Sequence, residues 1–322
     1  MSSQFETLFH RLKSGVSTVE LAYVPHDQWP LPRRPSANVT TSGPLRISVL
    51  DSSFNPPTLA HFALASTHAP TCLNHDSLGS ADFDARLLLL SVRNADKSLK
   101  PHDATYAQRL EMMILLAKDL MAEKDSHTPN GESNLAQPGQ SNVAVAIIDE
   151  PTFVGKSQVL LEFLQERLAS TSVDENRRVE GNDQSGASTT PTPRLTFLVG
   201  IDTLERILLA RYYASEEDMR QSLRHFLSSD GDDSYILCAR RVTQGLIEPE
   251  NTRERKVLSA VAKYLDFDRV VMVDIGAEVK TLSSSEVRER IGLQDALWKE
   301  MVTESVARYI TRQNLYALHD GI

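Results

Sequence analysis

The length and composition of the chain indicate a folded protein. Its 322 residues are 41% hydrophobic and 24% charged, which is enough apolar content to bury a core and excludes disorder as the overall state. The 43 acidic residues against 34 basic ones give a formal charge of −9. This is the wrong sign for a protein that mainly neutralises nucleic-acid phosphates, so we expect no nucleic acid among its partners.

The first residues and the cysteines indicate the compartment. Residues 1–16 fit an amphipathic helix, and no uncharged hydrophobic region or small-residue cleavage site follows, which argues against secretion. The apolar side of that helix carries Phe5, Leu8, Phe9 and Leu12. Apolar stretches such as residues 87–90 are far shorter than the roughly 20 residues that cross a bilayer, so we expect no membrane contact. Only Cys72 and Cys238 occur, which suits a reducing compartment; we expect the cytoplasm, with the nucleus as the alternative.

Six short apolar or β-branched runs predict buried strands. They occupy residues 46–50, 85–92, 143–148, 195–199, 234–239 and 270–273. Segments of helical length separate them, at residues 61–67, 106–123, 155–169, 202–209, 218–227 and 251–266. This alternation predicts an α/β protein with a Rossmann-like, doubly wound parallel sheet and helices on both faces. After residue 283 the chain favours helix only, including residues 302–313, which predicts a small C-terminal helical cap.

Two polar segments interrupt this pattern. Residues 122–142 and 170–194 are rich in turn-forming residues and nearly free of large apolar side chains, which predicts surface inserts or disordered loops. We interpret residues 1–44 as an N-terminal helix and linker, and residues 45–322 as one domain that carries both inserts. The alternative is that the inserts make the chain chiefly an interaction scaffold, although tolerated surface loops explain them equally well.

The turn after the first predicted strand is the first candidate for chemistry. Residues 51–61 read Asp-Ser-Ser-Phe-Asn-Pro-Pro-Thr-Leu-Ala-His and lead into a helix. In a doubly wound fold this turn faces the ligand crevice, where backbone amides and a helix N-terminus favour an anion such as phosphate. The alternative is that Asn-Pro-Pro is only a rigid turn and that His61 packs against its neighbours.

A second anion site is indicated late in the chain. Residues 282–288 read Leu-Ser-Ser-Ser-Glu-Val-Arg, with three hydroxyl groups at the start of a helix and Arg288 one turn later. Hydroxyl groups, exposed amides and a guanidinium group at a helix start favour an anion. The alternative is an ordinary serine N-cap with a solvated arginine.

Together the two motifs resemble those of the nucleotidylyltransferase superfamily, in which a Thr/His-x-x-His motif after the first strand and an Ile-Ser-Ser-Thr-x-x-Arg motif near the C-terminus bind the triphosphate. They stand here at residues 58–61 and 282–288. Within that superfamily the chain is most similar to the nicotinamide mononucleotide (NMN) adenylyltransferases. The segments that carry this similarity are Ser-Phe-Asn-Pro at 53–56, Gln-Arg-Leu-Glu-Met at 108–112, Gly-Ile-Asp at 200–202 and the closing helix at 309–316. The sequence of residues 51–62 is especially similar to that of a divergent fungal branch of the family, the promoter-of-filamentation proteins.

Two residues depart from the family pattern. Ser52 stands where the family has the glycine before Ser-Phe-Asn-Pro, and Ala60 replaces the glycine before the second histidine. Each adds a Cβ where a phosphate or a backbone comes close. They favour the alternative of an ATP-binding or ATP-hydrolysing regulatory protein on the same fold, whereas the intact His61 and Arg288 oppose it.

The resemblance implies an enzyme that joins ATP to NMN, or to its acid form (NaMN), by direct in-line adenylyl transfer. It implies Mg²⁺ with the ATP, no covalently bound cofactor and no metal site of protein side chains. The catalytic residues would be His61, Lys97 and Arg288. The ATP site would comprise Ser53, Phe54, Thr58, His61, Gly200, Asp202, Ser283, Ser284 and Arg288. The NMN site would comprise Ser52, Ser53, Asn55, Lys97, Phe153 and Tyr212.

Alternatives stand beside several of these assignments. Lys100 can replace Lys97 in bridging the two substrates. Tyr213 joins Phe153 and Tyr212 as a candidate to stack on the nicotinamide ring, and core packing is the alternative for all three. The nearest alternative function keeps the fold and changes the phosphate acceptor, to pantetheine phosphate, FMN, or phosphocholine or phosphoethanolamine in a cytidylyl transfer. The sequence is compatible with a homo-oligomer and identifies no protein partner.

Overall fold

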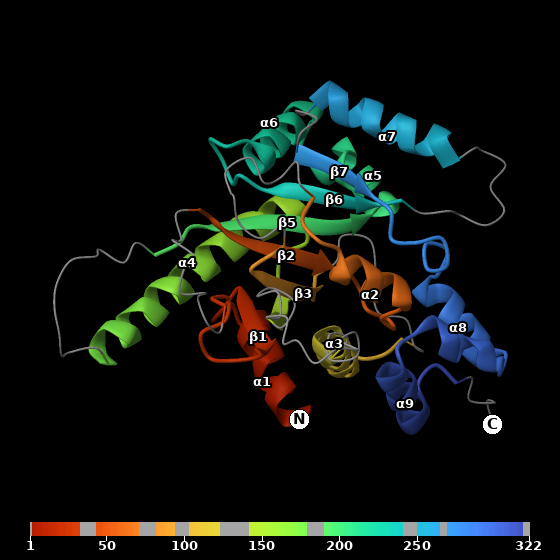
Figure 1. Ribbon diagram of the computed structural model, residues 1–322. Coiled ribbons are helices and arrows are strands. Elements are labelled where there is room, and N and C mark those ends of the chain that lie inside the picture. Colours follow the sequence, from red (N-terminus) through yellow and green to blue (C-terminus); the bar gives the residue numbers. More distant parts are fainter. Residues whose placement is uncertain are drawn as a thin grey trace, which may run out of the picture.

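The computed structural model describes residues 2–32, 43–70, 82–93, 103–122, 142–178, 190–240, 250–264 and 269–317. Within these ranges, a seven-stranded sheet in the order β1-β4-β3-β2-β5-β6-β7 forms the centre of the molecule (Figure 1). The strands are β1 (Val19–Tyr23), β2 (Leu45–Asp51), β3 (Ala85–Ser91), β4 (Val143–Ile148), β5 (Pro193–Gly200), β6 (Tyr235–Ala239) and β7 (Val270–Val273).

The topology of the sheet confirms the predicted fold class. β1 pairs with β4 in antiparallel fashion, and the five other strand pairs are parallel. Counted from β2, the parallel strands have the order 3-2-1-4-5-6, which is that of a doubly wound Rossmann-type sheet. All six predicted strands are present, and they form because apolar, β-branched runs suit strands that are covered on both faces.

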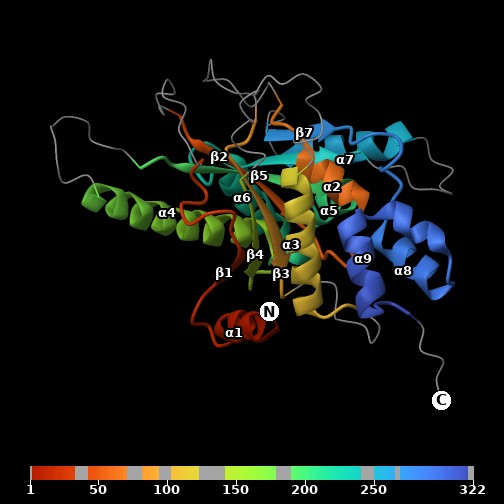
Figure 2. The ribbon, with the colours of Figure 1, turned by 60° about the horizontal axis from the view of Figure 1, so that its bottom comes forward.

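Helices cover both faces of this sheet. The helices that alternate with the strands are α2 (Leu59–Ser66), α3 (Tyr106–Ala122), α4 (Phe153–Arg178), α5 (Ile201–Ile207), α6 (Glu216–Leu227) and α7 (Glu250–Tyr264). α2 and α3 share one core cluster with the N-terminal helix α1 (Ser2–Lys13), whereas α4, α5, α6 and α7 share the other. Figure 2 shows α3 and α4 on opposite sides of the strands.

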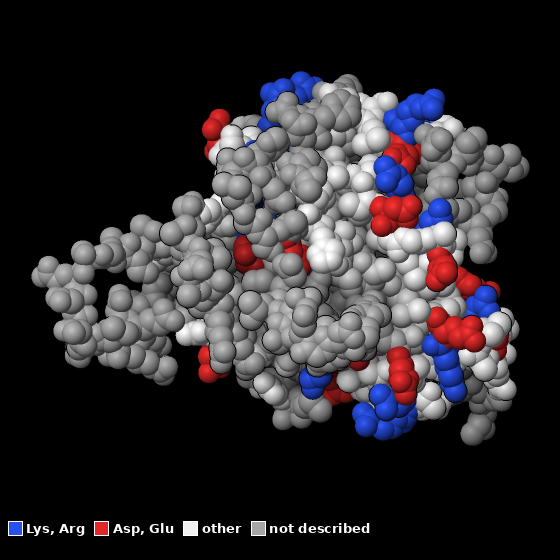
Figure 3. Space-filling model, viewed as in Figure 1, with Lys and Arg blue, Asp and Glu red and all other residues white. Residues whose placement is uncertain are grey.

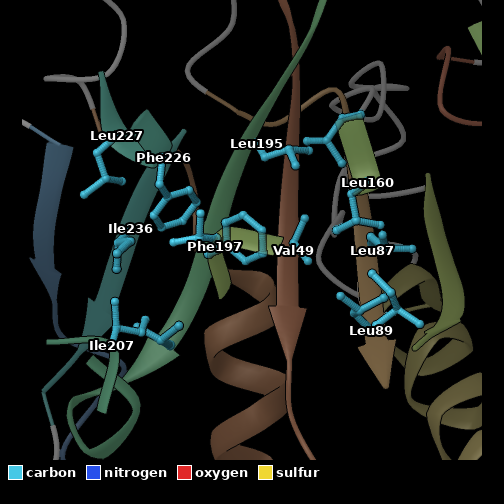
Figure 4. Packing of buried hydrophobic residues seen from close by; sticks show 14 of the residues in the cluster. Val49, Leu87, Leu89, Leu160, Leu195, Phe197, Ile207, Phe226, Leu227 and Ile236 are labelled. Atoms are coloured by element: carbon cyan, nitrogen blue, oxygen red, sulfur yellow. The ribbon is translucent and has the colours of Figure 1, made fainter. Parts of the chain in front are cut away.

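The larger core lies on the α4 to α7 face. Phe197 of β5 lies between Val49 of β2 and the β6 side, where it packs edge-on against Phe226 of α6 with ring centroids 5.4 Å apart (Figure 4). Leu160 of α4 covers the β3 side of the same layer. Full burial of one such side chain contributes about 1.5–3 kcal/mol, so this layer stabilises the pairing of β2 with β5.

The N-terminal segment contributes more to the fold than the sequence predicted. α1 is present as expected, and its Phe5 and Leu12 are buried in the cluster that contains α3. β1 was missed, and it pairs with β4 so that Val19 lies opposite Ile148. In addition to the predicted helix, residues 1–44 therefore contain an edge strand of the central sheet. The five-residue strand escaped prediction because only its first side chain is buried, which leaves no clear alternation of apolar and polar residues.

α4 is also longer than predicted. The helix was expected to end at residue 169 and instead continues to Arg178, so residues 170–178 of the second predicted insert are helical. Those residues include no glycine or proline, the residue types that most readily end a helix. Pro193 and Arg194, at the other end of the same insert, belong to β5. Residues 179–189 and 123–141 lie outside the described residues.

The C-terminal helical cap is present. It comprises α8 (Ser284–Gly292), the 3-10 helix η5 (Ala296–Met301) and α9 (Glu304–Gln313). Its apolar side chains, among them Trp298 and Ile310, pack with Met112 of α3 in a separate small core. This packing places α8 next to α2 although the two helices lie more than 200 residues apart in the chain (Figure 1). Among the helices of the described residues, none has the length and apolar character needed to cross a membrane.

Candidate functional site

The candidate site lies where the order of the sheet reverses. β2 and β5 are adjacent and parallel, and their connections leave to opposite faces of the sheet, α2 on one and α5 on the other. In doubly wound folds the ligand crevice opens at the carboxyl ends of such a strand pair. Here β2 continues into residues 52–58, which we call the 52–58 loop, and β5 ends at Gly200, the N-cap of α5.

His61 is held in one orientation by the loop that precedes it. The backbone N–H of Thr58 donates to His61 Nδ1 over 3.0 Å, and the Thr58 hydroxyl lies 2.9 Å from the same nitrogen. Because Nδ1 accepts a hydrogen bond, the proton of the neutral ring resides on Nε2. That Nε2–H donates to Ser52 Oγ over 2.9 Å. The sequence motif therefore presents an oriented N–H donor at the end of β2.

The 52–58 loop has an unusual backbone at its centre. Phe54 has a φ of 44°, and the peptide bond between Asn55 and Pro56 is cis. A non-glycine residue in the left-handed region costs of order 1–3 kcal/mol and persists only where its surroundings hold it. The Phe54 ring is fully buried and lies 5.3 Å from the His61 ring, so burial of this ring offsets the cost. Phe54, which was predicted to contact ATP, thus lies in the core beneath His61.

Asn55 connects the loop to the rest of the protein. Its side chain is 4% exposed: Nδ2 donates to Asp103 Oδ1 over 2.7 Å, and Oδ1 accepts from the N–H of Ala104 and the hydroxyl of Tyr316. Its backbone oxygen accepts from Nη1 of Arg288. The sequence predicted that Asn55 contacts NMN, whereas this geometry directs its amide into the protein and gives it the task of holding the loop.

The two sequence motifs meet at this loop. Ser284 Oγ, in the first turn of α8, donates to the carbonyl oxygen of Pro56 over 2.7 Å. Arg288, one turn later, donates to the carbonyl oxygen of Asn55 and, over 3.2 Å, to that of Ser284. Ser283 caps the helix, because its Oγ accepts from the N–H of Glu286. Two segments that lie more than 200 residues apart in the sequence are therefore in direct contact.

Charged groups pack against the same loop. Asp103 lies 3.5 Å from Arg109 Nη2 and 3.8 Å from Arg288 Nε. Arg109 also donates to the carbonyl oxygens of Ala104 and Ser53. Burial lowers the pKa of Arg109, and the charge of Asp103 opposes this effect. Two guanidinium groups against one carboxylate leave a net positive charge beside the loop, which favours an anionic ligand there.

A buried ion pair closes the α4 side of the site. Lys156 Nζ lies 2.6 Å from Asp51 Oδ2, and the two side chains are only 5% and 9% exposed. Asp51 is the last residue of β2, so the pair fixes the point at which the 52–58 loop begins. Removal of one partner from a buried pair typically costs 3–5 kcal/mol, so the pair stabilises this end of β2.

Gly200 and Asp202 lie at the neighbouring strand end. A Cβ added to Gly200 would meet no atom within 4 Å, so open space borders this residue. Asp202 belongs to the first turn of α5. Beside them, burial raises the pKa of the Cys238 thiol to about 12, so this cysteine stays protonated and is not a nucleophile.

The predicted aromatic partners of the nicotinamide ring differ in their surroundings. Phe153 packs edge-on against Phe197, with centroids 5.7 Å apart, and Lys156 Nζ lies 4.9 Å from its ring centroid. Tyr213 donates to the carbonyl oxygen of Ile207 and, like Phe153, packs against the larger core. The hydroxyl of Tyr212 accepts from Arg211 in an exposed contact. Core packing thus accounts for Phe153 and Tyr213, whereas the Tyr212 ring packs against Arg211, whose Cζ lies 4.8 Å from the ring centroid.

The structure adds residues that the motifs alone did not indicate as part of the site. They are Asp51, Asp103, Ala104, Arg109, Lys156 and Tyr316. One sequence signal could have pointed to them: an asparagine before two prolines in a buried turn has an amide that must find partners. Lys97 and Lys100, the predicted bridging cations, lie outside the described residues. In the part of the chain that is described, no group of three or more His, Cys, Asp or Glu side chains could hold a metal ion.

Charges on the surface are mixed. Lys and Arg alternate with Asp and Glu over the side of the molecule that carries α7, α8 and α9 (Figure 3). The arginines next to the 52–58 loop are therefore a local feature in a chain whose formal charge is −9. A site for a polyanion in an acidic protein needs such local charge.

Comparisons with known proteins bear on this site. No family model matches the chain. The chain is 33% identical over 199 residues to a candidate nicotinamide mononucleotide adenylyltransferase of Schizosaccharomyces pombe, a match that covers 62% of this chain and 55% of that protein. The chain thus spans little more than half the length of this curated relative. Two solved structures of Plasmodium falciparum nicotinic acid mononucleotide adenylyltransferase also match. The complex with APC has a TM-score of 0.41 at 12% identity, and the complex with NaAD has a TM-score of 0.42 at 14% identity. Each match covers 84% of this chain and 97% of the solved chain.

The fold and the site together define an α/β protein of the doubly wound class, with two arginines beside the loop at its topological switch point. Within that class, the curated relative confirms the resemblance to the nicotinamide mononucleotide adenylyltransferase family that the two motifs predicted.

Proposed function

We propose that the chain is an adenylyltransferase that joins ATP to NMN or NaMN and releases pyrophosphate. The observation that carries this proposal is the meeting of the two motifs, in which Ser284 and Arg288 bind the carbonyl oxygens of the loop that orients His61. The similarity to the fission-yeast relative supports the same family of reactions.

The reaction needs positioning more than acid or base chemistry. A 5′-phosphate oxygen of the mononucleotide attacks the α-phosphorus of ATP, and a new P–O bond forms. The bond between the α-phosphorus and the oxygen that bridges to the β-phosphate breaks, and pyrophosphate leaves with that electron pair. The nucleophile is already an anion at pH 7, so the barrier comes largely from repulsion between two polyanions. At 4 Å, two unit charges repel by about 4 kcal/mol at an effective dielectric constant of ~20.

His61 would donate its Nε2–H to a phosphate oxygen in the transition state. Thr58 fixes the neutral form that carries this proton, as its N–H occupies Nδ1. In the structure the donor is directed to Ser52 Oγ, so a phosphate oxygen would take the place of this hydroxyl group. A preorganised donor of this kind is typically worth about 10²–10³ in rate.

Arg288 would contact the β- and γ-phosphates through the part of its guanidinium group that reaches solvent. Its Nη1 holds the 52–58 loop, whereas its Nη2 contact with Ser285 Oγ is exposed and long, at 3.3 Å. A charged phosphate oxygen is the stronger acceptor and would replace that hydroxyl group. Ser283 and Ser284 would act by placing the N-terminus of α8, since their hydroxyl groups cap the helix and bind the loop.

The remaining predicted residues complete the two substrate sites. ATP would enter as its Mg²⁺ complex, with the ion held mainly by phosphate oxygens and water, which is how ATP-using sites generally take Mg²⁺. Gly200 offers open space for the close approach of a ribose, and Asp202 offers a carboxylate that accepts from its hydroxyl groups. Lys97 would bridge the phosphates of the two substrates. Tyr212 would stack on the nicotinamide, since it belongs to none of the core clusters, and the nicotinamide ring would then replace the guanidinium group of Arg211.

A second candidate function is that of an ATP-binding regulatory protein on the same fold. The specific observation in its favour is the hydrogen bond between Ser52 and His61, because it occupies the donor that the transfer would need. The resemblance leads us to place the transferase first, since His61, Ser284 and Arg288 are all present and assembled.

The experiment that tests the proposal is an assay of the purified chain with ATP and Mg²⁺ and with NMN, NaMN or no acceptor. We expect dinucleotide and pyrophosphate in equal amounts, and only when an acceptor is present. ATP binding without dinucleotide from either acceptor would reject the transferase and favour the regulatory protein. Pyrophosphate release with a different phosphate acceptor would keep the fold and reassign the substrate.

A further inference from the structure

The C-terminal cap touches the candidate site at one buried hydroxyl group. Tyr316 lies just beyond α9, where Asn314 and Tyr316 both adopt left-handed backbone angles, with φ of 50° and 65°. This backbone turns the chain back toward α3, and the Tyr316 side chain packs into the small core of the cap. Its hydroxyl donates to Asn55 Oδ1 over 2.9 Å, across 261 residues of sequence.

The acceptor of this hydrogen bond is the residue that fixes the 52–58 loop. The Asn55 amide also binds Asp103 and the N–H of Ala104, and the residue is 4% exposed. Removal of the Tyr316 hydroxyl group would leave Asn55 Oδ1 with one hydrogen-bond donor fewer, at a buried position where water cannot readily replace it. An under-satisfied buried acceptor costs about 1–3 kcal/mol, which a rotation of the amide or a shift of the loop would relieve.

A shift of the loop would reach the reacting groups. Asn55 is flanked by Phe54, the residue with positive φ that lies under the His61 ring, and by Pro56, whose carbonyl oxygen receives Ser284. His61 in turn takes its orientation from Thr58 and Ser52, at the two ends of the same loop. The loop therefore transmits a displacement at Asn55 to the only imidazole ring that the described part of the site contains.

We propose that Tyr316 is a positioning residue for the adenylyl transfer: its hydroxyl locks the Asn55 amide and so holds His61 and the α8 N-terminus in register. This inference rests on the proposed function for its kinetic consequence, whereas the lock itself can be measured without turnover. Burial raises the pKa of Tyr316, so the phenol stays neutral and keeps the proton that it donates.

The cap supplies a matched control. Tyr309 of α9 belongs to the same small core and is 5% exposed, against 7% for Tyr316. Its hydroxyl interacts with Glu111 of α3 instead of the loop. Tyr316→Phe and Tyr309→Phe therefore remove the same atom from the same core, and phenylalanine keeps the packing of either ring.

The experiment compares these two variants with the unchanged chain in three measurements. Thermal unfolding reports stability, and amide hydrogen exchange of peptides that cover residues 52–62 reports the order of the loop. Steady-state kinetics with ATP and NMN or NaMN report turnover. We expect similar, small losses in melting temperature for both. Only Tyr316→Phe should speed exchange in the 52–62 peptides, and it should lower kcat about tenfold while KM for ATP changes less than about twofold, since small misplacements of reacting groups are costly in rate.

Each outcome separates the lock from the function. Equal exchange and equal kcat in the two variants would overturn the inference and leave Tyr316 a packing residue. Faster exchange in Tyr316→Phe but no dinucleotide from the unchanged chain would confirm that Tyr316 holds the loop and reject the proposed function. A kcat loss without faster exchange would overturn the route through Asn55.

Discussion

The 52–58 loop with His61 and the start of α8 carry the two motifs of the site, yet they use their polar groups differently. In the first region, Thr58 and Ser52 orient a side chain whose N–H faces the strand ends. In the second, Ser284 and Arg288 donate hydrogen bonds to backbone carbonyl oxygens of the first. The first region thus supplies the N–H donor of His61, and the second holds the loop that orients this donor. A change at His61 should therefore alter turnover more than stability, whereas a change at Arg288 should alter both.

His61→Ala should produce the largest effect on turnover. Loss of the oriented donor is expected to lower kcat by about 10²-fold or more, while the free energy of unfolding falls by only about 1 kcal/mol for the lost contact with Thr58. Kinetics and denaturant unfolding on the same preparation check both numbers. His68→Ala is the control, because His68 is exposed at the far end of α2 and pairs with Asp82. A kcat within a few-fold of the unchanged chain would remove His61 from the chemistry.

Arg288→Ala should show a mixed effect. We expect kcat/KM for ATP to fall by about 10- to 100-fold, the value of one charge-assisted hydrogen bond. The free energy of unfolding should also fall by about 1–3 kcal/mol, because the Asn55 carbonyl and Asp103 lose a donor. Arg290→Ala is the control on the same helix, since Arg290 pairs with Glu286 and Asp295 away from the loop. A loss of activity with unchanged stability would mean that Arg288 serves the substrate alone.

Ser283→Ala and Ser284→Ala should separate capping from loop support. Ser283→Ala removes the N-cap of α8 and should cost about 1 kcal/mol of stability, with little change in KM. Ser284→Ala removes the bond to Pro56 and should raise KM for ATP about fivefold. Unfolding curves and ATP titrations of the two variants measure this difference. The reverse pattern would show that ATP binding depends on the N-cap of α8 and not on the bond between Ser284 and the loop.

Ser52→Ala should have the smallest effect. Without the hydroxyl group, His61 Nε2–H has one competitor fewer, and ATP should bind up to about fivefold more tightly, as expected for one hydrogen bond of ~1 kcal/mol. Equilibrium titration with ATP and Mg²⁺ measures the dissociation constant. Weaker binding would instead show that the Ser52 hydroxyl contacts the ligand itself.

Local sequence patterns could predict most strands and helices but not the contacts between the two regions. The runs that form β2 to β7 are local patterns, so their periodicity and composition predicted them, and the alternation with helices predicted the sheet. The pairing of residues 58–61 with 282–288 came from the family resemblance, because no local pattern joins segments so far apart. β1 was missed because a short edge strand buries little, and the end of α4 because polar residues without glycine or proline can continue a helix.

The contacts that complete the site were beyond prediction for a physical reason. Asn55 meets Tyr316 and Asp103 only after the cap has packed on α3. In a loop or at a surface, each of these side chains could adopt many solvated conformations. Only the tertiary fold selects the one that is observed. The same holds for Phe153: the family resemblance suggested that it stacks on the nicotinamide ring, whereas in the structure it packs against Phe197 at an interplanar angle of 72°.

β1 has a consequence for how the chain behaves at high concentration. β4 consists of six buried apolar residues, and β1 covers its outer hydrogen-bonding edge. The opposite edge strand of the described sheet, β7, has only four residues, and short edge strands pair poorly with other molecules. A chain trimmed to begin at residue 45, where composition alone suggested that the domain starts, would expose β4 as a flat apolar edge and invite edge-to-edge aggregation. The N-terminal segment thus covers one lateral edge of the sheet, whereas the candidate site lies at the carboxyl ends of β2 and β5.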